Sequence, residues 1–310
     1  MTLKNSVQDF LLHCRIEKNL SQKTLKAYET DLLQLINFLQ PGMLVSEVSK
    51  FSIRDYMAKI ANLKPKSIRR KISTLKTMFS YLEFDDKIAI NPFRKMKLKI
   101  RIDKKLPSVM SIKEIHKILK KAYTSNPNPD QTRFTYYEYL RNIVVLELLF
   151  NTGARVSEVA NLKTENINLE NGGILIKGKG NKERLIHICN EEAITVLKKY
   201  YKLFYQKSGS ADGHFLVNRF NKKLSDQSIR NIVKKYVAKA GINRRITPHV
   251  FRHSFATLLL EKDVDIRYIQ HFLGHSSIIT TQLYTHVNRS KQKQILRTKH
   301  PRGQISMQYE

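Results

Sequence analysis

Apolar residues recur at intervals of three and four along much of this chain, and this periodicity limits the fold to one built mainly of helices. The repeat is clear in residues 21–42 and again in residues 66–84, and residues 51–63 have the same character. A helix turns once every 3.6 residues, so such a repeat places the apolar side chains on one face. The repeating positions are Leu25, Tyr28, Leu32, Leu35 and Leu39, and then Ile68, Ile72, Leu75, Phe79 and Leu82. Residues 1–93 are therefore predicted to form a small helical domain.

One stretch breaks the helical pattern. In residues 172–188, GGILIKGKGNKERLIHI, two runs of alternating apolar residues flank a Gly-Lys-Gly turn, which is typical of a β-hairpin. A helix, a break at Gly153 and a second helix precede the hairpin, and further helices follow it up to about Arg297. Residues 109–310 are thus predicted to form a second domain, mainly α with a small sheet, in which residues 124–139 are a polar loop.

Net charge is the strongest functional signal in the composition. Lys and Arg number 56 against 26 acidic residues, a formal net charge of +30. This excess predicts a polyanionic partner, and no broad apolar face accompanies it that would favour a membrane surface, so we expect nucleic acid. The helix at 66–84 has one basic face, from which Lys66, Arg69 and Arg70 are predicted to contact DNA, with Lys71 and Lys76 beside them.

Residues 94–108 join the two predicted domains, and seven of the first twelve are basic. The run has no helical stripe and contains Pro107, so we expect an extended linker that lies along phosphates. The two cysteines, Cys14 and Cys189, lie far apart and do not have the spacing of metal ligands. No apolar run reaches membrane-spanning length, and the N-terminal residues lack the pattern of a signal peptide. We therefore expect a cytoplasmic protein.

Four residues of the second domain carry side chains suited to phosphate chemistry. Arg155 follows the glycine break, and Lys179 lies at the tip of the predicted hairpin. His249 and Arg252 are three positions apart, on one face of a predicted helix that Thr247 caps. An imidazole and a guanidinium so placed can donate to the oxygens of a pentavalent phosphorus, and a lysine at a hairpin tip can protonate a leaving oxygen.

His275 and Tyr284 lie nine positions apart, close enough to belong to the same pocket. A zinc site is the alternative, because His249 and His253, like His271 and His275, are four positions apart, a spacing that metal ligands use. Neither pair contains the glutamate of an H-E-x-x-H motif, and no cysteine lies nearby. We therefore expect no metal and no cofactor, and a structural role for His253 and His271.

Five sequence fragments, taken together, resemble the tyrosine site-specific recombinases of the phage integrase family, most of all the bacterial Xer type. They are TGARVSE, GKGNKERLIHI, TPHVFRHSFATLLL, LGHSSIITTQLYTHV and HPRG, and their order and spacing match the family over the last two-thirds of the chain. The N-terminal part resembles the core-binding domain of the family less specifically. The resemblance implies two domains that close on DNA as a C-shaped clamp.

The same resemblance implies a role for each candidate residue. By this resemblance, Arg155 and Arg252 would clamp the scissile phosphate, and His249 and His275 would donate hydrogen bonds to it and help to move protons. Lys179 would protonate the leaving 5′ oxygen, and Tyr284 would be the nucleophile. A 3′-phosphotyrosyl link would form without ATP or metal, because the phosphodiester is exchanged and not hydrolysed.

The implied function is site-specific recombination of double-stranded DNA through a Holliday junction, as a mobile-element integrase or as a resolvase of chromosome or plasmid dimers. The implied assembly is a homotetramer, or a heterotetramer with a related recombinase, and it is associated with the nucleoid. Whether an accessory protein takes part is left open. Residues 288–300 are expected to form a short basic helix that contacts a neighbouring protomer. Two alternatives remain: a non-catalytic DNA-binding relative, and a type IB topoisomerase-like enzyme that relaxes a single duplex.

Overall fold

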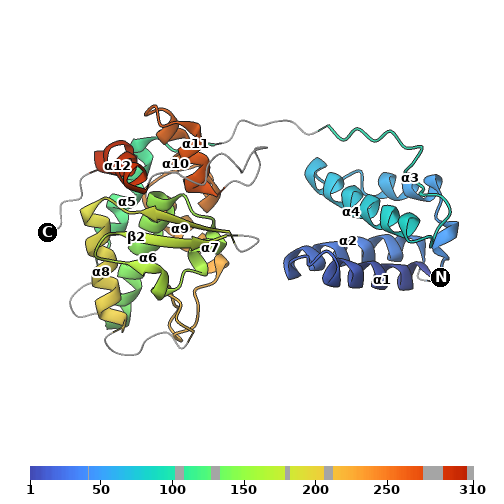
Figure 1. The fold of residues 1–310 in the computed structure, drawn as a ribbon, viewed down its shortest axis with the longest axis horizontal. Helices are drawn as coiled ribbons and strands as arrows, with labels where there is room; N and C mark the ends of the chain where they lie inside the picture. The colour runs from blue at the N-terminus through green and yellow to red at the C-terminus, as the bar shows by residue number, and fades with distance from the viewer. Residues whose placement is uncertain are drawn as a thin grey trace. The chain divides into compact units, whose positions relative to one another are not determined.

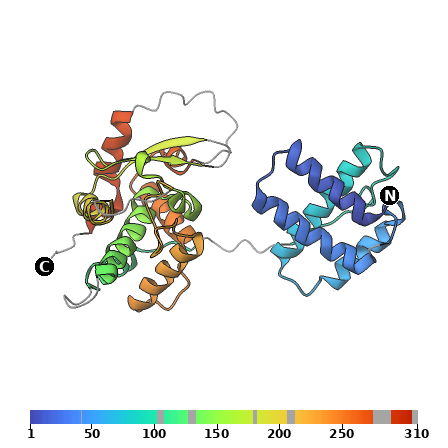
Figure 2. The ribbon, with the colours of Figure 1, turned by 90° about the horizontal axis from the view of Figure 1, so that it is seen from below.

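The computed structural model of the chain describes residues 1–40, 42–101, 108–126, 133–178, 182–205, 212–274 and 289–305, without the side chains of 133, 134, 205 and 289–292. The chain divides into two compact units, Met1–Lys105 and Leu106–Glu310 (Figures 1 and 2). Each unit has its own apolar core. Within the described residues, no helix is both long enough and apolar enough to cross a membrane.

The first unit is helical, as its apolar periodicity predicts. Its elements are α1 (Leu3–Ile16), α2 (Gln22–Leu39), the short 3-10 helix η1 (Val45–Glu47), α3 (Lys50–Lys59) and α4 (Pro65–Phe84). Ser21 caps α2 by accepting from the backbone N–H of Thr24, and Pro65 begins α4 at a position where a proline loses no helical hydrogen bond. The sequence pattern gave no separate prediction for α1, whose buried face includes Val7, Phe10 and Cys14.

The basic face of α4 differs from the predicted one at one position. Lys71 is buried, and its ammonium donates to the carboxylate of Asp31 and to the side chain of Gln34. Asp31 is itself fully buried and also accepts from Arg70, whose side chain is half exposed. The placement of Lys71 on the exposed face was therefore wrong, because a buried carboxylate from α2 draws the ammonium inward. Lys66 and Arg69 are exposed.

The segment after α4 packs against the first unit. Met96 is buried in its core, and Leu98 and Ile100 lie partly buried against the same cluster. Lys97, Lys99 and Arg101 alternate with them and are exposed. Residues 102–107, where the predicted linker continues, lie outside the described residues. Residues 96–101 thus have no regular secondary structure. Their apolar side chains face the core of the first unit and their basic side chains face solvent.

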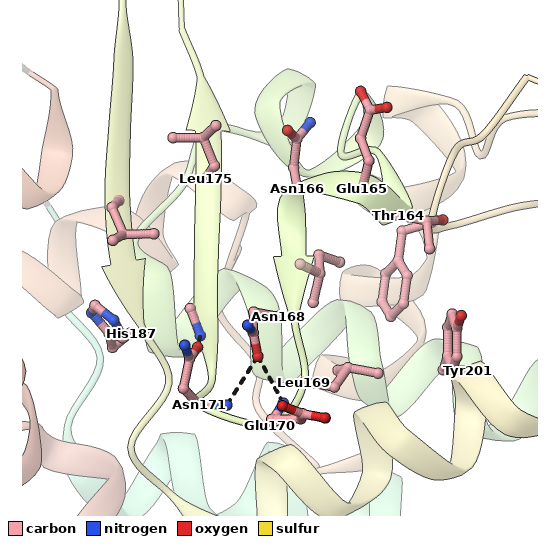
Figure 3. Close-up of a pocket in the computed structure, with 14 residues that line it drawn as sticks. Thr164, Glu165, Asn166, Asn168, Leu169, Glu170, Asn171, Leu175, His187 and Tyr201 are labelled. Atoms are coloured by element: carbon pink, nitrogen blue, oxygen red, sulfur yellow. Dashed lines mark hydrogen bonds between the residues drawn. The ribbon is translucent and has the colours of Figure 1, made fainter.

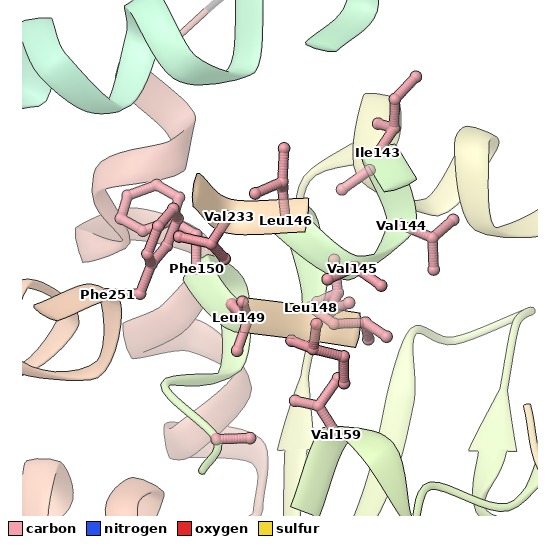
Figure 4. Close-up of a cluster of buried hydrophobic side chains, with 14 of the residues drawn as sticks. Ile143, Val144, Val145, Leu146, Leu148, Leu149, Phe150, Val159, Val233 and Phe251 are labelled. Carbon is pink, nitrogen blue, oxygen red and sulfur yellow. The ribbon is translucent and has the colours of Figure 1, made fainter. Parts of the chain in front are cut away.

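The second unit is built around α6. Its elements are α5 (Ile112–Tyr123), α6 (Arg133–Thr152), α7 (Val156–Ala160), η2 (Thr164–Asn166), β1 (Ile167–Asn168), β2 (Gly173–Lys177), β3 (Glu183–His187), α8 (Glu191–Tyr205), α9 (Asp226–Lys239), α10 (Pro248–Leu260), α11 (Ile266–Leu273), α12 (Arg289–Lys299) and η4 (Pro301–Gln304). Helix α6 contacts α5, α7, α8, α9 and α10. Its side chains meet Val159 of α7, Val233 of α9 and Phe251 of α10 in one buried cluster (Figure 4).

The predicted hairpin is confirmed. Strands β2 and β3 pair antiparallel from Gly173 opposite His187 to Lys177 opposite Glu183, and the two-residue strand β1, which the sequence did not predict, extends the sheet. The backbone N–H of Gly178 donates to the carbonyl of Lys182 at 2.7 Å and closes the base of the turn. The tip of the hairpin, residues 179–181, lies outside the described residues.

The loop predicted at residues 124–139 is shorter than expected, because α6 already begins at Arg133. The aromatic end of that segment belongs to the core. The hydroxyl of Tyr137 lies 2.9 Å from that of Tyr200, and the hydroxyl of Tyr139 donates to the carbonyl of Tyr123 at 2.6 Å. These tyrosines were predicted to lie in a loop, whereas Tyr137 is buried and Tyr139 is partly buried in α6, where their hydroxyls find hydrogen-bond partners.

The predicted C-terminal helix is confirmed as α12, and the residues after it are anchored in the second unit. Arg302 is fully buried and donates to both carboxylate oxygens of Glu147 on α6, and to Glu192 on α8. Leu296 and Ile305 are buried in the same core. The HPRG fragment thus places a guanidinium against a fully buried carboxylate that also accepts from the side chains of Tyr123 and Asn151.

His300, at the start of this anchor, predicts a pH dependence of stability. Its ring packs beside Phe150 and Phe255, its Nδ1 accepts from the backbone N–H of Arg302, and burial lowers its pKa from 6.5 to about 4. Between these values only the unfolded chain takes up the proton, so acidification favours unfolding. We expect a loss of about 1 kcal/mol in the free energy of unfolding between pH 7 and pH 5.5.

Denaturant titrations at several pH values measure this loss. His300→Asn should flatten the profile, because asparagine still offers a capping oxygen to the N–H of Arg302 and does not titrate. His253→Asn, on α10, is the matched control and should leave the slope unchanged. An unaltered slope in His300→Asn would show that another group is responsible.

Candidate functional site

The site begins at a tight turn between α6 and α7. Gly153 has a positive φ of +58°, and a Cβ there would lie 2.7 Å from Cδ1 of Phe255 and 3.0 Å from Cδ2 of Leu273. Only glycine therefore fits between α10 and α11 at this point. The turn delivers Arg155 to the start of α7, where its side chain is 38% exposed and so accessible to a ligand. The predicted glycine break between α6 and α7 thus packs against α10 and α11 beside Arg155.

Glu158 holds Arg155 in place. One carboxylate oxygen accepts from the backbone N–H of Arg155 and the other accepts from its guanidinium, both at 2.8 Å. The first oxygen also accepts from Arg184 of β3 at 2.7 Å. Burial alone would raise the pKa of Glu158, but the hydrogen bonds and charges of Arg184 and Arg155 outweigh it and keep the pKa below its ordinary value.

Arg252 occupies the centre of the same region. It is buried on α10, and its guanidinium donates to the carbonyls of Gly153 at 2.8 Å and of Leu273 at 2.6 Å. Burial, with the nearby charges of Arg155 and Arg184, lowers the pKa of Arg252 to about 10, while Glu158 opposes the shift. The group therefore stays charged at neutral pH, at an electrostatic cost that a bound anion would relieve.

Two guanidiniums thus contact a single carboxylate, and a third, that of Arg252, lies within electrostatic range of it. Arg155, Arg184 and Arg252 contribute three positive charges, and Glu158 contributes one negative charge. Arg184 and Arg252 are removed from water, so this excess of charge is poorly screened. The arrangement suits an anion with several oxygens, such as a phosphodiester approaching the exposed guanidinium of Arg155.

The histidines are distributed over the first turn of α10 and the end of α11. Pro248 is the first residue of α10, and His249 beside it is exposed. Thr247 is the N-cap residue, but its side chain makes no capping hydrogen bond, so that part of the prediction was wrong. His271 is half buried, and burial followed by the charge of Arg184 lowers its pKa.

Lys179, His275 and Tyr284 lie outside the described residues. The structure does place the chain immediately before two of them. Gly178, at the base of the hairpin, lies beside Glu158 and Arg184, since a Cβ there would come within 3.5 Å and 3.9 Å of their side chains. Gly274 ends α11 in the left-handed conformation, and a Cβ there would lie 3.1 Å from Nη1 of Arg184.

Sequence reasoning missed Glu158 and Arg184. The signal for Glu158 was its position three residues after Arg155 at a helix start, where a carboxylate can accept from the capping backbone. The signal for Arg184 was a basic residue two positions before the buried Ile186 in a strand of alternating apolar residues, because residues two apart share one face of the sheet. Neither local sequence pattern indicates that Glu158 and Arg184 bond to each other.

Two other features of the described residues do not form part of this site. A pocket of about 620 Å³ lies over the outer face of the sheet, lined by residues such as Asn168, Leu175 and Tyr201 (Figure 3), and the three catalytic candidates that the structure describes, Arg155, His249 and Arg252, do not line it. In the described part of the chain, no group of three or more His, Cys, Asp or Glu side chains is arranged to hold a metal ion. His275, a member of the alternative zinc set, lies outside the described residues.

Comparison with known sequences identifies both units. The Phage integrase family matches residues 109–291, and the Phage integrase N-terminal SAM-like domain matches residues 7–84. A tyrosine recombinase of Agathobacter rectalis is 43% identical over 301 residues, which cover 97% of each chain. Tyrosine recombinase XerC of Thermodesulfovibrio yellowstonii is 34% identical over 95% of this chain and 96% of its own, and XerD of Listeria innocua is 33% identical over 97% and 100%.

Solved structures show the same fold. The XerH recombinase bound to its palindromic difH substrate superposes with a TM-score of 0.70 at 23% identity, covering 94% of this chain and 83% of that one. A lambda integrase dimer bound to a COC′ core site superposes with a TM-score of 0.68 at 20% identity, covering 89% and 96%. The chain therefore belongs to the phage integrase family and is a tyrosine recombinase, most like the Xer type, that acts in site-specific DNA recombination.

Proposed function

We propose that the cluster around Glu158 is the phosphate-binding half of the cleavage site and that Arg155 and Arg252 clamp the scissile phosphate. The observation that carries this proposal is the excess of guanidinium over carboxylate in a mostly buried cluster with one exposed arginine. During cleavage the charge on the phosphorus oxygens grows, and preformed donors stabilise that charge more than they stabilise the ground state.

The chemistry follows from six residues, of which His249 and His275 donate hydrogen bonds to the phosphate. The phenol oxygen of Tyr284 attacks the scissile phosphorus and passes its proton to one of these two histidines, while the bond from phosphorus to the 5′ oxygen breaks. Lys179 gives a proton to that oxygen. The product is a 3′-phosphotyrosyl link and a free 5′-hydroxyl. Attack by the 5′-hydroxyl of a second duplex reverses the step and joins two different strands.

The expected partner is double-stranded DNA with a specific recombination site. Solved structures of this fold support it, since they include XerH bound to its difH substrate and a lambda integrase tetramer bound to a Holliday junction. We infer a tetramer that exchanges strands in pairs, in the cytoplasm on the nucleoid. The choice between integration and dimer resolution depends on the target site.

The first unit supplies further phosphate contacts. Lys66 and Arg69 on α4 are exposed, as are Lys97, Lys99 and Arg101 in the docked part of the linker. Arg70 differs from them, because it pairs with the buried Asp31. We therefore expect Lys66 and Arg69 to contact DNA and Arg70 to stabilise the unit.

Salt dependence of DNA binding separates these roles. Each phosphate contact contributes about 0.9 to the slope of log affinity against log salt concentration, so Lys66→Ala and Arg69→Ala should each lower the slope by about that amount. Lys4→Ala, an exposed lysine on α1, is the control and should leave the slope unchanged. Arg70→Ala should instead lower the unfolding midpoint. Unchanged slopes for both α4 variants would exclude this face from the interface.

A trapping experiment tests the proposed chemistry. The protein is incubated in EDTA with nicked duplexes that carry candidate sites, so that the cleaved strand diffuses away and the covalent intermediate accumulates. Denaturing electrophoresis followed by peptide mapping should locate the DNA-linked residue at Tyr284. A covalent bond to any other residue would overturn the assignment, and a product that forms only when EDTA is left out would favour the zinc alternative. Relaxation of a supercoiled plasmid without a recombination site would favour the topoisomerase alternative.

A further inference from the structure

Arg184 stands where the fold would ordinarily place an apolar side chain. On β3 it lies opposite Ile176, and it shares the parity of Ile186, which is fully buried. Its side chain is 5% exposed, so it does not itself reach a bound phosphodiester. A buried ion pair seldom stabilises a protein more than well-packed apolar residues in the same space. A local departure from the strand pattern of this kind is expected at functional positions.

The hydrogen bonds of Arg184 join the two halves of the phosphate clamp. Its Nη2 donates at 2.7 Å to Glu158, the carboxylate that holds Arg155. Its Nε donates at 2.6 Å to the carbonyl of Phe272, and the next carbonyl, that of Leu273, accepts from Arg252 at 2.6 Å. One planar guanidinium thus fixes the partner of Arg155 and the helix end that holds Arg252.

We infer that Arg184 is a positioning residue for DNA cleavage, which sets the guanidiniums of Arg155 and Arg252 at a fixed separation before the phosphate arrives. The inference rests on the proposed function, because it assumes that these two arginines neutralise the scissile phosphate. Lysine at position 184 keeps the charge but lacks the planar fork, so it cannot donate to Glu158 and to the Phe272 carbonyl in the same geometry. Arg184→Lys should therefore leave the clamp loosely spaced while preserving the net charge of the site.

The test compares two substrates at saturating DNA. One duplex has an ordinary scissile phosphate, and the other has a methylphosphonate there, which carries no negative charge for the arginines to neutralise. We expect Arg184→Lys to slow formation of the covalent complex about 30-fold on the phosphate, a loss typical of one charge-assisted hydrogen bond. On the methylphosphonate the same variant should stay within about threefold of the wild-type rate, because the need for the clamp has been removed.

Two variants make the outcome specific. Arg155→Lys should show the same dependence on substrate charge as Arg184→Lys. Arg141→Lys is the matched control, since Arg141 is also buried in the second unit and also bonds a carboxylate and a carbonyl, those of Glu138 and Val217. It should cleave both substrates at the wild-type rate.

Each result has a definite meaning. Equal slowing of Arg184→Lys on both substrates, with Arg155→Lys still sensitive to substrate charge, overturns the positioning role and leaves the proposed function standing. Equal slowing of Arg155→Lys on both substrates overturns the proposed role of Arg155 itself. If Arg184→Lys does not fold at the assay temperature, Glu158→Gln replaces it, because the neutral amide weakens the contacts to both arginines while filling the same space, and the same criteria apply.

Discussion

Tyr284→Phe is expected to abolish the covalent protein–DNA complex, lowering its rate of formation by more than about 10⁴-fold. Phenylalanine keeps the ring and removes the only oxygen that could form the phosphotyrosyl link. DNA affinity should stay within about twofold of wild type, because affinity depends mainly on phosphate contacts made by basic side chains. Covalent product on nicked duplexes and equilibrium binding, measured on the same preparations, check both parts.

A tyrosine elsewhere in the same unit provides the control. Tyr201 lies on α8 and is 38% exposed, so a phenol there is as accessible as a nucleophile would need to be. Tyr201→Phe should form the covalent complex at the wild-type rate. Covalent product that persists in Tyr284→Phe would show that another tyrosine attacks the phosphorus.

The helices and the hairpin could be predicted because their signals are local. Apolar residues three and four apart share a helix face whatever the rest of the chain does, and alternation around a Gly-Lys-Gly turn favours a hairpin. The errors arose where a distant residue decides the outcome. Lys71 was placed on the exposed face of α4, but Asp31, 40 positions away, pairs with it in the interior. Residues 133–139 were taken for a loop, but Tyr137 extends α6 by packing against Tyr200.

In the candidate site too, some residues could be predicted from the sequence and others only from the fold. Arg155 and Arg252 could be proposed from motifs, because each lies within a few residues of a helix start. Their supporting residues were not found, because the bond from Arg184 to Glu158 spans 26 positions and the bond from Arg184 to Phe272 spans 88. A motif records which groups meet the substrate, whereas the groups that hold them are set by tertiary packing.

Arg302→Met is expected to lower the free energy of unfolding of the second unit by about 3–5 kcal/mol. Arg302 and Glu147 are both fully buried, and Arg302 approaches both oxygens of that carboxylate. Methionine fills much of the space but leaves Glu147 with only the neutral donors Tyr123 and Asn151. A buried charge without a countercharge is far less stable than the pair, so removing one partner costs more than removing both.

Urea titrations followed by circular dichroism measure this effect, and if the two units unfold separately only one transition should move. Arg297→Met is the matched control, because Arg297 is an exposed arginine on α12 five positions earlier, and its loss should change stability by less than about 0.5 kcal/mol. The double variant Arg302→Met with Glu147→Gln should recover at least about half of the loss, since no net charge is then buried. If Arg302→Met were as stable as Arg297→Met, the segment from His300 to Ile305 would not be docked in solution, and the anchor of the C-terminal helix would have to lie elsewhere.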